Sequence, residues 1–318
     1  MKKILITRPM PKAVEDRARN LGDTTFRRAT TPLCADEMVL ALTDFDVVLP
    51  TLGDQFSAEI FAKVDAPRAQ LLANFGVGYN HIDVGTANSK GLTVTNTPGA
   101  VTDATADIAM TLMLMTARRA GEGERMVRAG QWKGWYPTQM LGLHISGKTV
   151  AIIGMGRIGQ AIARRCHFGF GMRVVYATRS AKQLDFPAEP CSSISEASGK
   201  ADVVVVAVPG GAATKHLINA DVFHGMQRHA IFVNIARGDV VDEAALIQAL
   251  QNGTIAGAGL DVYEFEPKVP AELIAMDHVT LFPHLGTASL EVRTGMGNMA
   301  LDNIEAFISG QALPNLVE

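Results

Sequence analysis

Residues 146–160 read SGKTVAIIGMGRIGQ, a short apolar run of β-forming residues that ends in the motif G-x-G-x-x-G. Residues 161–165 continue with helical composition, so the stretch predicts a strand, a tight glycine turn and the start of a helix. Gly154 allows the sharp turn, Gly156 allows a pyrophosphate to approach the backbone, and Gly159 allows the helix to pack on the strand. The positive end of the helix dipole then faces the phosphates. We therefore predict a dinucleotide-binding site at this turn.

Strands and helices alternate after the glycine turn. The run 201–208 is apolar throughout, which is typical of a central parallel strand that is covered on both faces. Further strands are predicted at 172–177, 230–235, 256–262 and 279–282, with helices such as 242–251 between them. This order predicts a doubly wound Rossmann domain over residues 101–287, with its ligands beyond the C-terminal ends of the strands.

Residues 1–100 alternate in the same way. Strands are predicted at 3–7, 46–49, 70–73 and 92–96, and helices at 12–20, 35–43 and 57–64. The last predicted helix, 288–309, follows the completed sheet of the other domain and is expected to return to this one. The predicted fold class is α/β with two doubly wound parallel-sheet domains. They are a flavodoxin-like substrate domain of residues 1–100 and 288–318, and a Rossmann dinucleotide-binding domain of residues 101–287.

The segment 104–117 is apolar on nearly every side. Such a helix is buried between layers, domains or subunits, and this one is too short to cross a membrane. We expect an interface helix. The following segment, 121–145, contains two tryptophans and no clear period, so it is expected to leave the sheet as an excursion.

The composition limits the classes of partner. The chain has 318 residues, of which 47% are hydrophobic and 19% charged, and its net charge of −3 gives no electrostatic reason to expect nucleic acid or an anionic membrane. The apolar run at the N-terminus stops at Ile6, and Pro9 follows, which is too short for a signal peptide. The three cysteines lack the spacing of a metal or redox motif. We expect a cytoplasmic protein with free thiols and no bound metal.

The end of the second strand bears on the choice of nicotinamide cofactor. In the usual fingerprint an acidic residue there binds the ribose hydroxyl of NAD. Here Thr178 takes that place, and Arg179 and Ser180 follow. A carboxylate would repel a 2′-phosphate, whereas a guanidinium and a hydroxyl would bind it. The alternative is a solvated turn that is basic by chance. We predict NADP(H) as the preferred cofactor, with NAD(H) possible.

Polar residues follow three predicted strands at one edge of the sheet. Arg237 follows the first strand, Asp261 and Glu266 follow the second, and His284 follows the third. Each alone has an ordinary structural explanation, but together they match one reaction. Reduction of a 2-oxo acid needs a cation for the carboxylate, a proton donor for the carbonyl oxygen, and an acid that keeps the donor protonated.

The motifs GMGRIG, NIARG, GLDVYEFEP and PHLG, in that order, resemble the D-isomer-specific 2-hydroxyacid dehydrogenases over essentially the whole chain. The resemblance implies that Arg237 binds and polarises the substrate and that His284 is the acid/base. It further implies that Glu266 helps His284 to keep its proton, and that Asp261 lies beside the nicotinamide. Other residues expected at the cofactor are Arg157, Ile158, Val208, Pro209, Ile235, Ala236 and Gly286.

Two segments outside that edge also resemble family elements. Residues 74–83, NFGVGYNHID, resemble the substrate loop, in which the amides of Val77 and Gly78 would bind the carboxylate. Thr105 matches a residue that contacts the cofactor at the start of the interdomain helix. The sequence departs from the family at 208–214, VPGGAAT, where relatives often have P-x-T-P-x-T. Contacts beyond the backbone are therefore not expected from residues 210–212.

Residues 130–137, GQWKGWYP, resemble the segment of glyoxylate/hydroxypyruvate reductases in which the second tryptophan reaches the active site of the neighbouring subunit. Trp135 would then narrow the pocket in a homodimer; alternatively, both tryptophans only anchor a dimer loop. We predict an NADPH-preferring reductase of glyoxylate or hydroxypyruvate. The alternatives are a dehydrogenase for 2-ketogluconate, D-lactate or D-3-phosphoglycerate, and a non-catalytic NAD(P) sensor like the corepressors of this fold.

Overall fold

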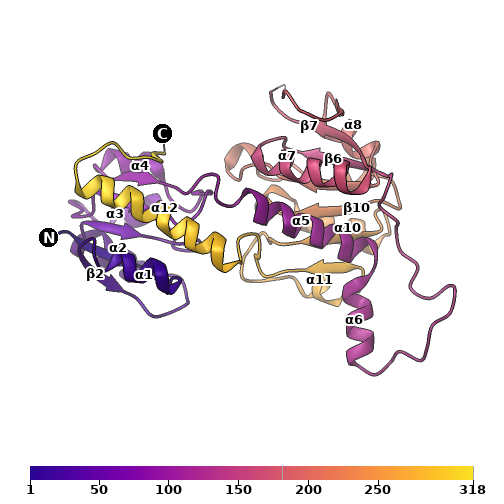
Figure 1. Cartoon of the computed structure of the whole chain (residues 1–318), viewed down its shortest axis with the longest axis horizontal. Helices are drawn as coiled ribbons and strands as arrows, with labels where there is room; N and C mark the ends of the chain where they lie inside the picture. Colours follow the sequence, from indigo (N-terminus) through magenta and orange to yellow (C-terminus); the bar gives the residue numbers. More distant parts are fainter. Residues whose placement is uncertain (181, 318) are drawn as a thin grey trace. The chain divides into compact units, whose positions relative to one another are not determined.

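The computed structural model describes residues 1–180 and 182–317; Ala181 and Glu318 lie outside the described residues. The chain divides into two compact units. Unit 1 consists of Met1–Val101 and Ala288–Glu318, and unit 2 of Thr102–Thr287. Each unit contains one parallel β-sheet with helices packed on it (Figure 1). The predicted α/β fold with two parallel sheets is therefore confirmed.

Unit 1 has a five-stranded sheet in the order β2-β1-β3-β4-β5, with every described pair of strands parallel. Its strands are β1 (Lys3–Ile6), β2 (Asp23–Phe26), β3 (Val47–Leu49), β4 (Leu71–Ala73) and β5 (Thr93–Thr95). Its helices are α1 (Lys12–Ala18), α2 (Ala35–Asp44), α3 (Ala58–Ala62), α4 (Val84–Ser89) and α12 (Leu290–Ile308). This is the flavodoxin-like order, in which the strand order reverses between β1 and β3 and ligands bind beyond the strands at that point.

The strands of unit 1 bury alternate residues on opposite faces of the sheet. On one face Ile4 and Ile6 pack in a core with Leu301 of α12. On the other face Leu5 packs in a second core with Phe61 of α3. The C-terminal helix α12 contacts α1 and β4, so it completes the layer on the first of these faces.

Unit 2 has a seven-stranded parallel sheet in the order β12-β11-β10-β9-β6-β7-β8. Its strands are β6 (Thr149–Ile153), β7 (Arg173–Ala177), β8 (Ala188–Pro190), β9 (Val203–Val206), β10 (Ile231–Asn234), β11 (Gly257–Leu260) and β12 (Val279–Leu281). Its α-helices are α5 (Thr102–Ala117), α6 (Ala120–Arg128), α7 (Arg157–Arg164), α8 (Ile194–Gly199), α9 (Ala220–Gly225), α10 (Glu243–Gln251) and α11 (Ala271–Ala275). The strand order reverses between β6 and β9, which is the Rossmann pattern and places the glycine turn after β6 at the switch point.

Helix α5 lies flat on this sheet because the strand beneath it is rich in glycine. A Cβ on Gly259 would lie 2.9 Å from Oγ1 of Thr116 and 3.0 Å from Cβ of Leu112, both of α5. The same helix packs against α7 on another side. Contacts inside unit 2 thus account for much of the apolar character of α5. Its polar residues Asp107 and Thr111 are exposed.

The strands β2 and β8 and the helix α6 are among the elements that the sequence did not predict. The strand β2 has a largely polar sequence at the edge of its sheet, and β8 is a three-residue edge strand. The helix α6 lies in the stretch for which no clear period was predicted, and none of its residues is buried. Among the described helices, none combines the length and the apolar character needed to cross a membrane.

Candidate active site

The glycine turn after β6 has the geometry of a phosphate-binding turn. Gly154 has φ of +100°, and a Cβ on it would lie 2.7 Å from the carbonyl oxygen of Ala207. A Cβ on Gly159 would lie 2.0 Å from the carbonyl oxygen of Gly154, so the helix α7 can pack on the turn only with glycine here. At Gly156, the residue before α7, a Cβ would meet nothing within 4 Å. The space over Gly156 is therefore open for a group that approaches the backbone at the helix N-terminus.

The residues predicted to determine the preference for NADP(H) or NAD(H) lie next to that turn. The amide of Gly154 donates to the carbonyl oxygen of Ala177 at 2.9 Å, so Thr178 follows directly beside the glycines. Arg179 and Ser180 are exposed, and Thr178 is half-buried. Val208 and Pro209 follow β9, the neighbouring strand at the switch point.

The loop after β10 carries Arg237 and is shaped by a buried asparagine. The amide nitrogen Nδ2 of Asn234 donates to the carbonyl oxygen of Arg237 at 3.1 Å, and the Asn234 Oδ1 accepts from the amide of Ala236 at 3.0 Å. Nη1 of Arg237 donates to the carbonyl oxygen of Ala236 at 2.6 Å. Burial lowers the pKa of Arg237, and the charges of Glu266 and Asp239 offset this only in part.

Two glycines allow this loop to pack closely. A Cβ on Gly210 would lie 2.6 Å from Cγ of Arg237, so the alkyl part of the arginine lies against Gly210. A Cβ on Gly238 would lie 1.8 Å from the carbonyl carbon of Tyr263. No side chain fits at Gly238, because the loop after β10 crosses the backbone of the loop after β11 there. The crossing brings the segment of Arg237 against the segment of Glu266.

Asp261 fixes the loop that follows β12. The side chain is buried, and its carboxylate accepts from the amides of Leu285 at 2.6 Å and Gly286 at 2.8 Å. Burial raises the pKa of Asp261, while these two amides and the nearby His284 lower it. Thr105 of α5 donates through Oγ1 to the carbonyl oxygen of Gly286 at 3.2 Å. The predicted cofactor residues Thr105, Asp261 and Gly286 thus form one connected group.

His284 and Glu266 form a pair at the end of the sheet. Nδ1 of His284 lies 2.8 Å from Oε2 of Glu266, and the other oxygen of that carboxylate accepts from the amide of Tyr263 at 3.1 Å. The amide of His284 donates to the carbonyl oxygen of Asp261 at 3.0 Å. His284 has φ of +55°, a left-handed backbone that a non-glycine residue rarely adopts. The backbone thus turns sharply at the histidine that faces Glu266.

The predicted substrate loop of unit 1 is also built by a buried asparagine. Nδ2 of Asn74 donates to the carbonyl oxygens of Gly76 and Gly78, each at 3.0 Å, while Oδ1 lies 3.0 Å from Nε2 of the buried His81. Gly76 has φ of +156°. The asparagine therefore orients the segment that includes Val77, whose side chain is exposed.

The tryptophan segment after α6 has no regular secondary structure and exposes its aromatic side chains. Trp132 is 54% exposed, and Trp135 is 79% exposed. Single exposed apolar residues are common on monomers, but two tryptophans in one irregular segment are not.

The sequence of the chain matches a family model over residues 110–286, the NAD binding domain of the D-isomer specific 2-hydroxyacid dehydrogenases. A glyoxylate reductase of Thermococcus kodakarensis is 41% identical over 322 residues, which covers 99% of this chain and 96% of that protein. The chain belongs to the D-isomer specific 2-hydroxyacid dehydrogenase family. The family resemblance predicted from the motifs is thereby confirmed.

Other members of the family extend the comparison. A glycerate dehydrogenase of Hyphomicrobium methylovorum is 34% identical, with 97% of each chain covered. The solved structure of an NADPH-dependent glyoxylate/hydroxypyruvate reductase of Sinorhizobium meliloti, in complex with NADP and malonate, has a TM-score of 0.87 and 35% identity. The match covers 99% of this chain and 96% of that one. The chain is thus an NAD(P)-dependent member of the dehydrogenase family.

Sequence reasoning gave no role to several residues that shape this dehydrogenase site. Asn234 and Gly238 lie inside the motif that identifies Arg237, but their roles depend on contacts with other loops. Gly210 lies in the segment that departs from the family pattern, where no side-chain contact was expected; the absence of its side chain is what makes room for Arg237. His216, which matches no motif, pairs with Glu264 through Nε2 at 2.8 Å.

Proposed function

We propose that this dehydrogenase reduces glyoxylate and hydroxypyruvate to glycolate and D-glycerate, with NADPH as the preferred reductant. The observation that carries the proposal is the 2.8 Å contact between Nδ1 of His284 and Glu266, beside the buried loop of Arg237. Full-length relatives of about two-fifths identity that are named glyoxylate reductase support the substrate class.

The residues of the chain have separate parts in the proposed reaction. Arg237 and the amides of Val77 and Gly78 bind the carboxylate of the substrate. Nδ1 of His284 is engaged by Glu266, so Nε2 is the nitrogen that donates a proton to the carbonyl oxygen. Glu266 stabilises the protonated imidazole until that transfer. Trp135 of a second subunit narrows the pocket and favours small 2-oxo acids.

The residues present fit a dinucleotide. The open space over Gly156 and the N-terminus of α7 suit a pyrophosphate, and no carboxylate follows β7 where NAD enzymes use one. When bound, the nicotinamide supplies a hydride to the carbonyl carbon. We propose that Thr178, Arg179 and Ser180 bind the 2′-phosphate, and that Asp261, Thr105 and Gly286 lie at the nicotinamide end. The other residues proposed at the cofactor are Gly154, Arg157, Ile158, Gly159, Val208, Pro209, Ile235 and Ala236.

Replacing Arg179 with alanine tests the cofactor preference. We expect the variant to lose about tenfold or more in kcat/KM for NADPH, because a charge-assisted hydrogen bond contributes about 1.5–3 kcal/mol, and to change little with NADH. Absorbance at 340 nm with glyoxylate measures both rates. The matched control is Arg173→Ala, which removes an exposed arginine at the opposite end of the same strand. An equal effect on both cofactors, or a wild type that prefers NADH, would contradict the proposal.

The exposed tryptophans lead to a proposal about assembly. We expect a homodimer of twice 33.9 kDa in light scattering after size exclusion, because burial of Trp132 and Trp135 in a second copy removes two large aromatic surfaces from water. Trp135→Ala should raise KM for glyoxylate even in a variant that remains dimeric. A monomeric wild type with full activity would refute both the dimer and the proposed part of Trp135.

A further inference from the structure

The strand ends of unit 1 contain an arginine that the family motifs do not explain. Arg8 follows β1 by two residues, at the point where the strand order of this sheet reverses. Two of its guanidinium nitrogens, Nε and Nη2, are buried and donate to no acceptor among the described residues. The side chain as a whole is 21% exposed. Burial of two guanidinium donors without hydrogen bonds is costly, so the position of Arg8 requires an explanation.

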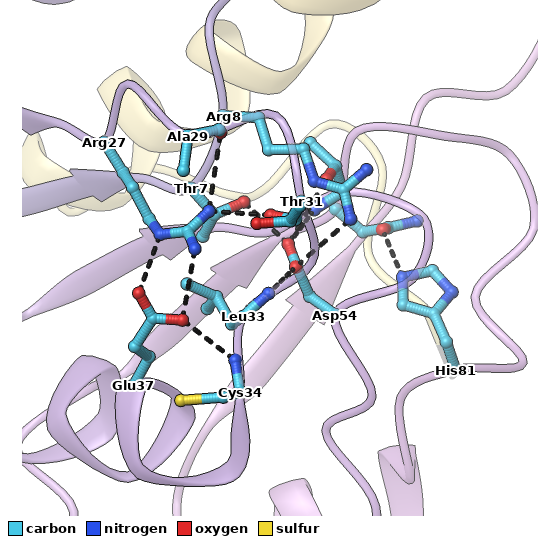
Figure 2. Close-up of polar contacts among 12 residues, drawn as sticks. Thr7, Arg8, Arg27, Ala29, Thr31, Leu33, Cys34, Glu37, Asp54 and His81 are labelled. Carbon is cyan, nitrogen blue, oxygen red and sulfur yellow. Dashed lines mark hydrogen bonds and ion pairs between the residues drawn. The ribbon is translucent and has the colours of Figure 1, made fainter.

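The ion pair with Asp54 does not satisfy the buried hydrogen-bond donors of Arg8. Nη2 of Arg8 lies 3.6 Å from Oδ1 of Asp54, which is an ion pair but is too long for a hydrogen bond (Figure 2). The carboxylate of Asp54 is fully buried and already accepts from Thr7 Oγ1 at 2.6 Å, from the Leu33 amide at 2.9 Å and from the Thr51 amide at 2.8 Å. Its hydrogen-bonding capacity is met largely by other donors. Arg8 therefore balances the charge of Asp54 without donating a hydrogen bond to it, and its buried donors remain unsatisfied within the described residues.

The fold makes room for this guanidinium. Gly53 has φ of +100°, and a Cβ on it would lie 2.9 Å from Nη2 of Arg8. The segment on the other side is fixed by Arg27, which donates to the carbonyl oxygen of Thr31 at 2.7 Å and pairs with Glu37 (Figure 2). Arg27 has all its partners within the protein, whereas Arg8 does not. Of these two neighbouring arginines, Arg8 is therefore the one with donors left for a ligand.

The cluster around Asp54 is connected to the proposed substrate loop within the same unit. Thr51, which donates to Asp54, forms a parallel β-bridge with Phe75, the residue before Gly76. The amide of Phe75 donates to the carbonyl oxygen of Pro50 at 2.9 Å. The end of β3, where the guanidinium of Arg8 lies, is therefore adjacent to the end of β4, about 5 Å away across the sheet.

We propose that Arg8 is a specificity residue that donates a hydrogen bond to the polar group on C3 of a 2-oxo acid, as in hydroxypyruvate. The inference rests on the proposed function, in which the amides of Val77 and Gly78 bind the carboxylate. Because Arg8 and Asp54 together carry no net charge, they suit a neutral hydroxyl better than a second anionic group. Nε and Nη2 are buried, so Nη1 is the nitrogen that would donate to this hydroxyl.

The test compares three substrates in the whole enzyme with NADPH. Hydroxypyruvate carries the C3 hydroxyl, pyruvate replaces it with hydrogen, and glyoxylate lacks C3. We expect Arg8→Gln to lower the ratio of kcat/KM for hydroxypyruvate to that for pyruvate about tenfold or more, because one hydrogen bond from a charged donor is lost. A similar loss with all three substrates would overturn the inference, since it would make Arg8 only the counterion of Asp54.

Two further variants keep the test decisive. Arg8→Gln leaves Asp54 without a counterion and can unfold unit 1, so the double variant R8Q/D54N removes both charges and should show the same fall in the ratio. The matched control Arg27→Gln removes the neighbouring structural arginine and should leave the ratio unchanged while it lowers the melting temperature. A wild type that reduces none of the three acids refutes the proposed function itself, whereas an active wild type whose ratio survives R8Q/D54N refutes only the role of Arg8.

Discussion

Replacing His284 with alanine is expected to lower kcat for glyoxylate by about 10²–10⁴-fold, the usual contribution of a positioned general acid. The variant should still fold, because the side chain of His284 is partly exposed and its loop is fixed by Asp261 through the amides of Leu285 and Gly286. Steady-state kinetics with NADPH and circular dichroism check the two parts. Retention of more than a tenth of the wild-type kcat would refute the assignment.

The partner of His284 provides a graded control. Glu266→Gln preserves the size of the side chain and an oxygen that can accept from the amide of Tyr263, but it removes the negative charge 2.8 Å from Nδ1. We expect a smaller loss in kcat than for His284→Ala, because the donor remains and only its electrostatic support is gone. The double variant should be no slower than His284→Ala alone, since residues that act as a unit are not additive.

The sequence allowed prediction of the parts of this site that depend on local patterns. The glycine turn was predictable because Gly159 is needed where one strand and the following helix cross, and Gly154 is needed for the positive φ of the turn between them. The strand ends were predictable because apolar runs stop where Arg237 and His284 begin. Both patterns can be recognised in a single chain segment without knowledge of its neighbours.

The residues that shape the loops were not predictable in this way. Gly238 is required by the backbone of Tyr263, which lies 25 positions further along the chain. Gly210 is required by the side chain of Arg237, and Asp54 gathers donors from three separate segments. Such contacts arise only when the loops of different strands meet at one edge of the sheet. The helix α6 was missed for a different reason, because its nine residues include only two large apolar ones, Met126 and Val127, which are too few to define a period.

Replacing Arg237 with methionine should separate function from stability more sharply than any other change. The methionine preserves most of the alkyl chain that lies against Gly210, so the packing is largely maintained. The loss of the guanidinium removes the cation that binds the substrate carboxylate. Removal of one partner of a buried, hydrogen-bonded charge pair, here the proposed pair of Arg237 and the substrate carboxylate, costs about 2–5 kcal/mol. This predicts a fall in kcat/KM of about 30-fold to several thousand-fold. The kcat/KM of Arg237→Lys should lie between those of the wild type and Arg237→Met, because lysine retains the charge but not the planar guanidinium that binds a carboxylate with two hydrogen bonds.

The stability of the same variant should move little or even rise. Burial lowers the pKa of Arg237, which means that the folded protein disfavours the charged form of this side chain relative to water. Glu266 and Asp239 offset that penalty only in part, so the arginine is retained at a cost in folding free energy. Thermal unfolding of Arg237→Met should therefore give a melting temperature no lower than that of the wild type by more than a few degrees. A large drop would show that Arg237 serves mainly to stabilise the loop, and the low activity of the variant would then be no evidence for substrate binding.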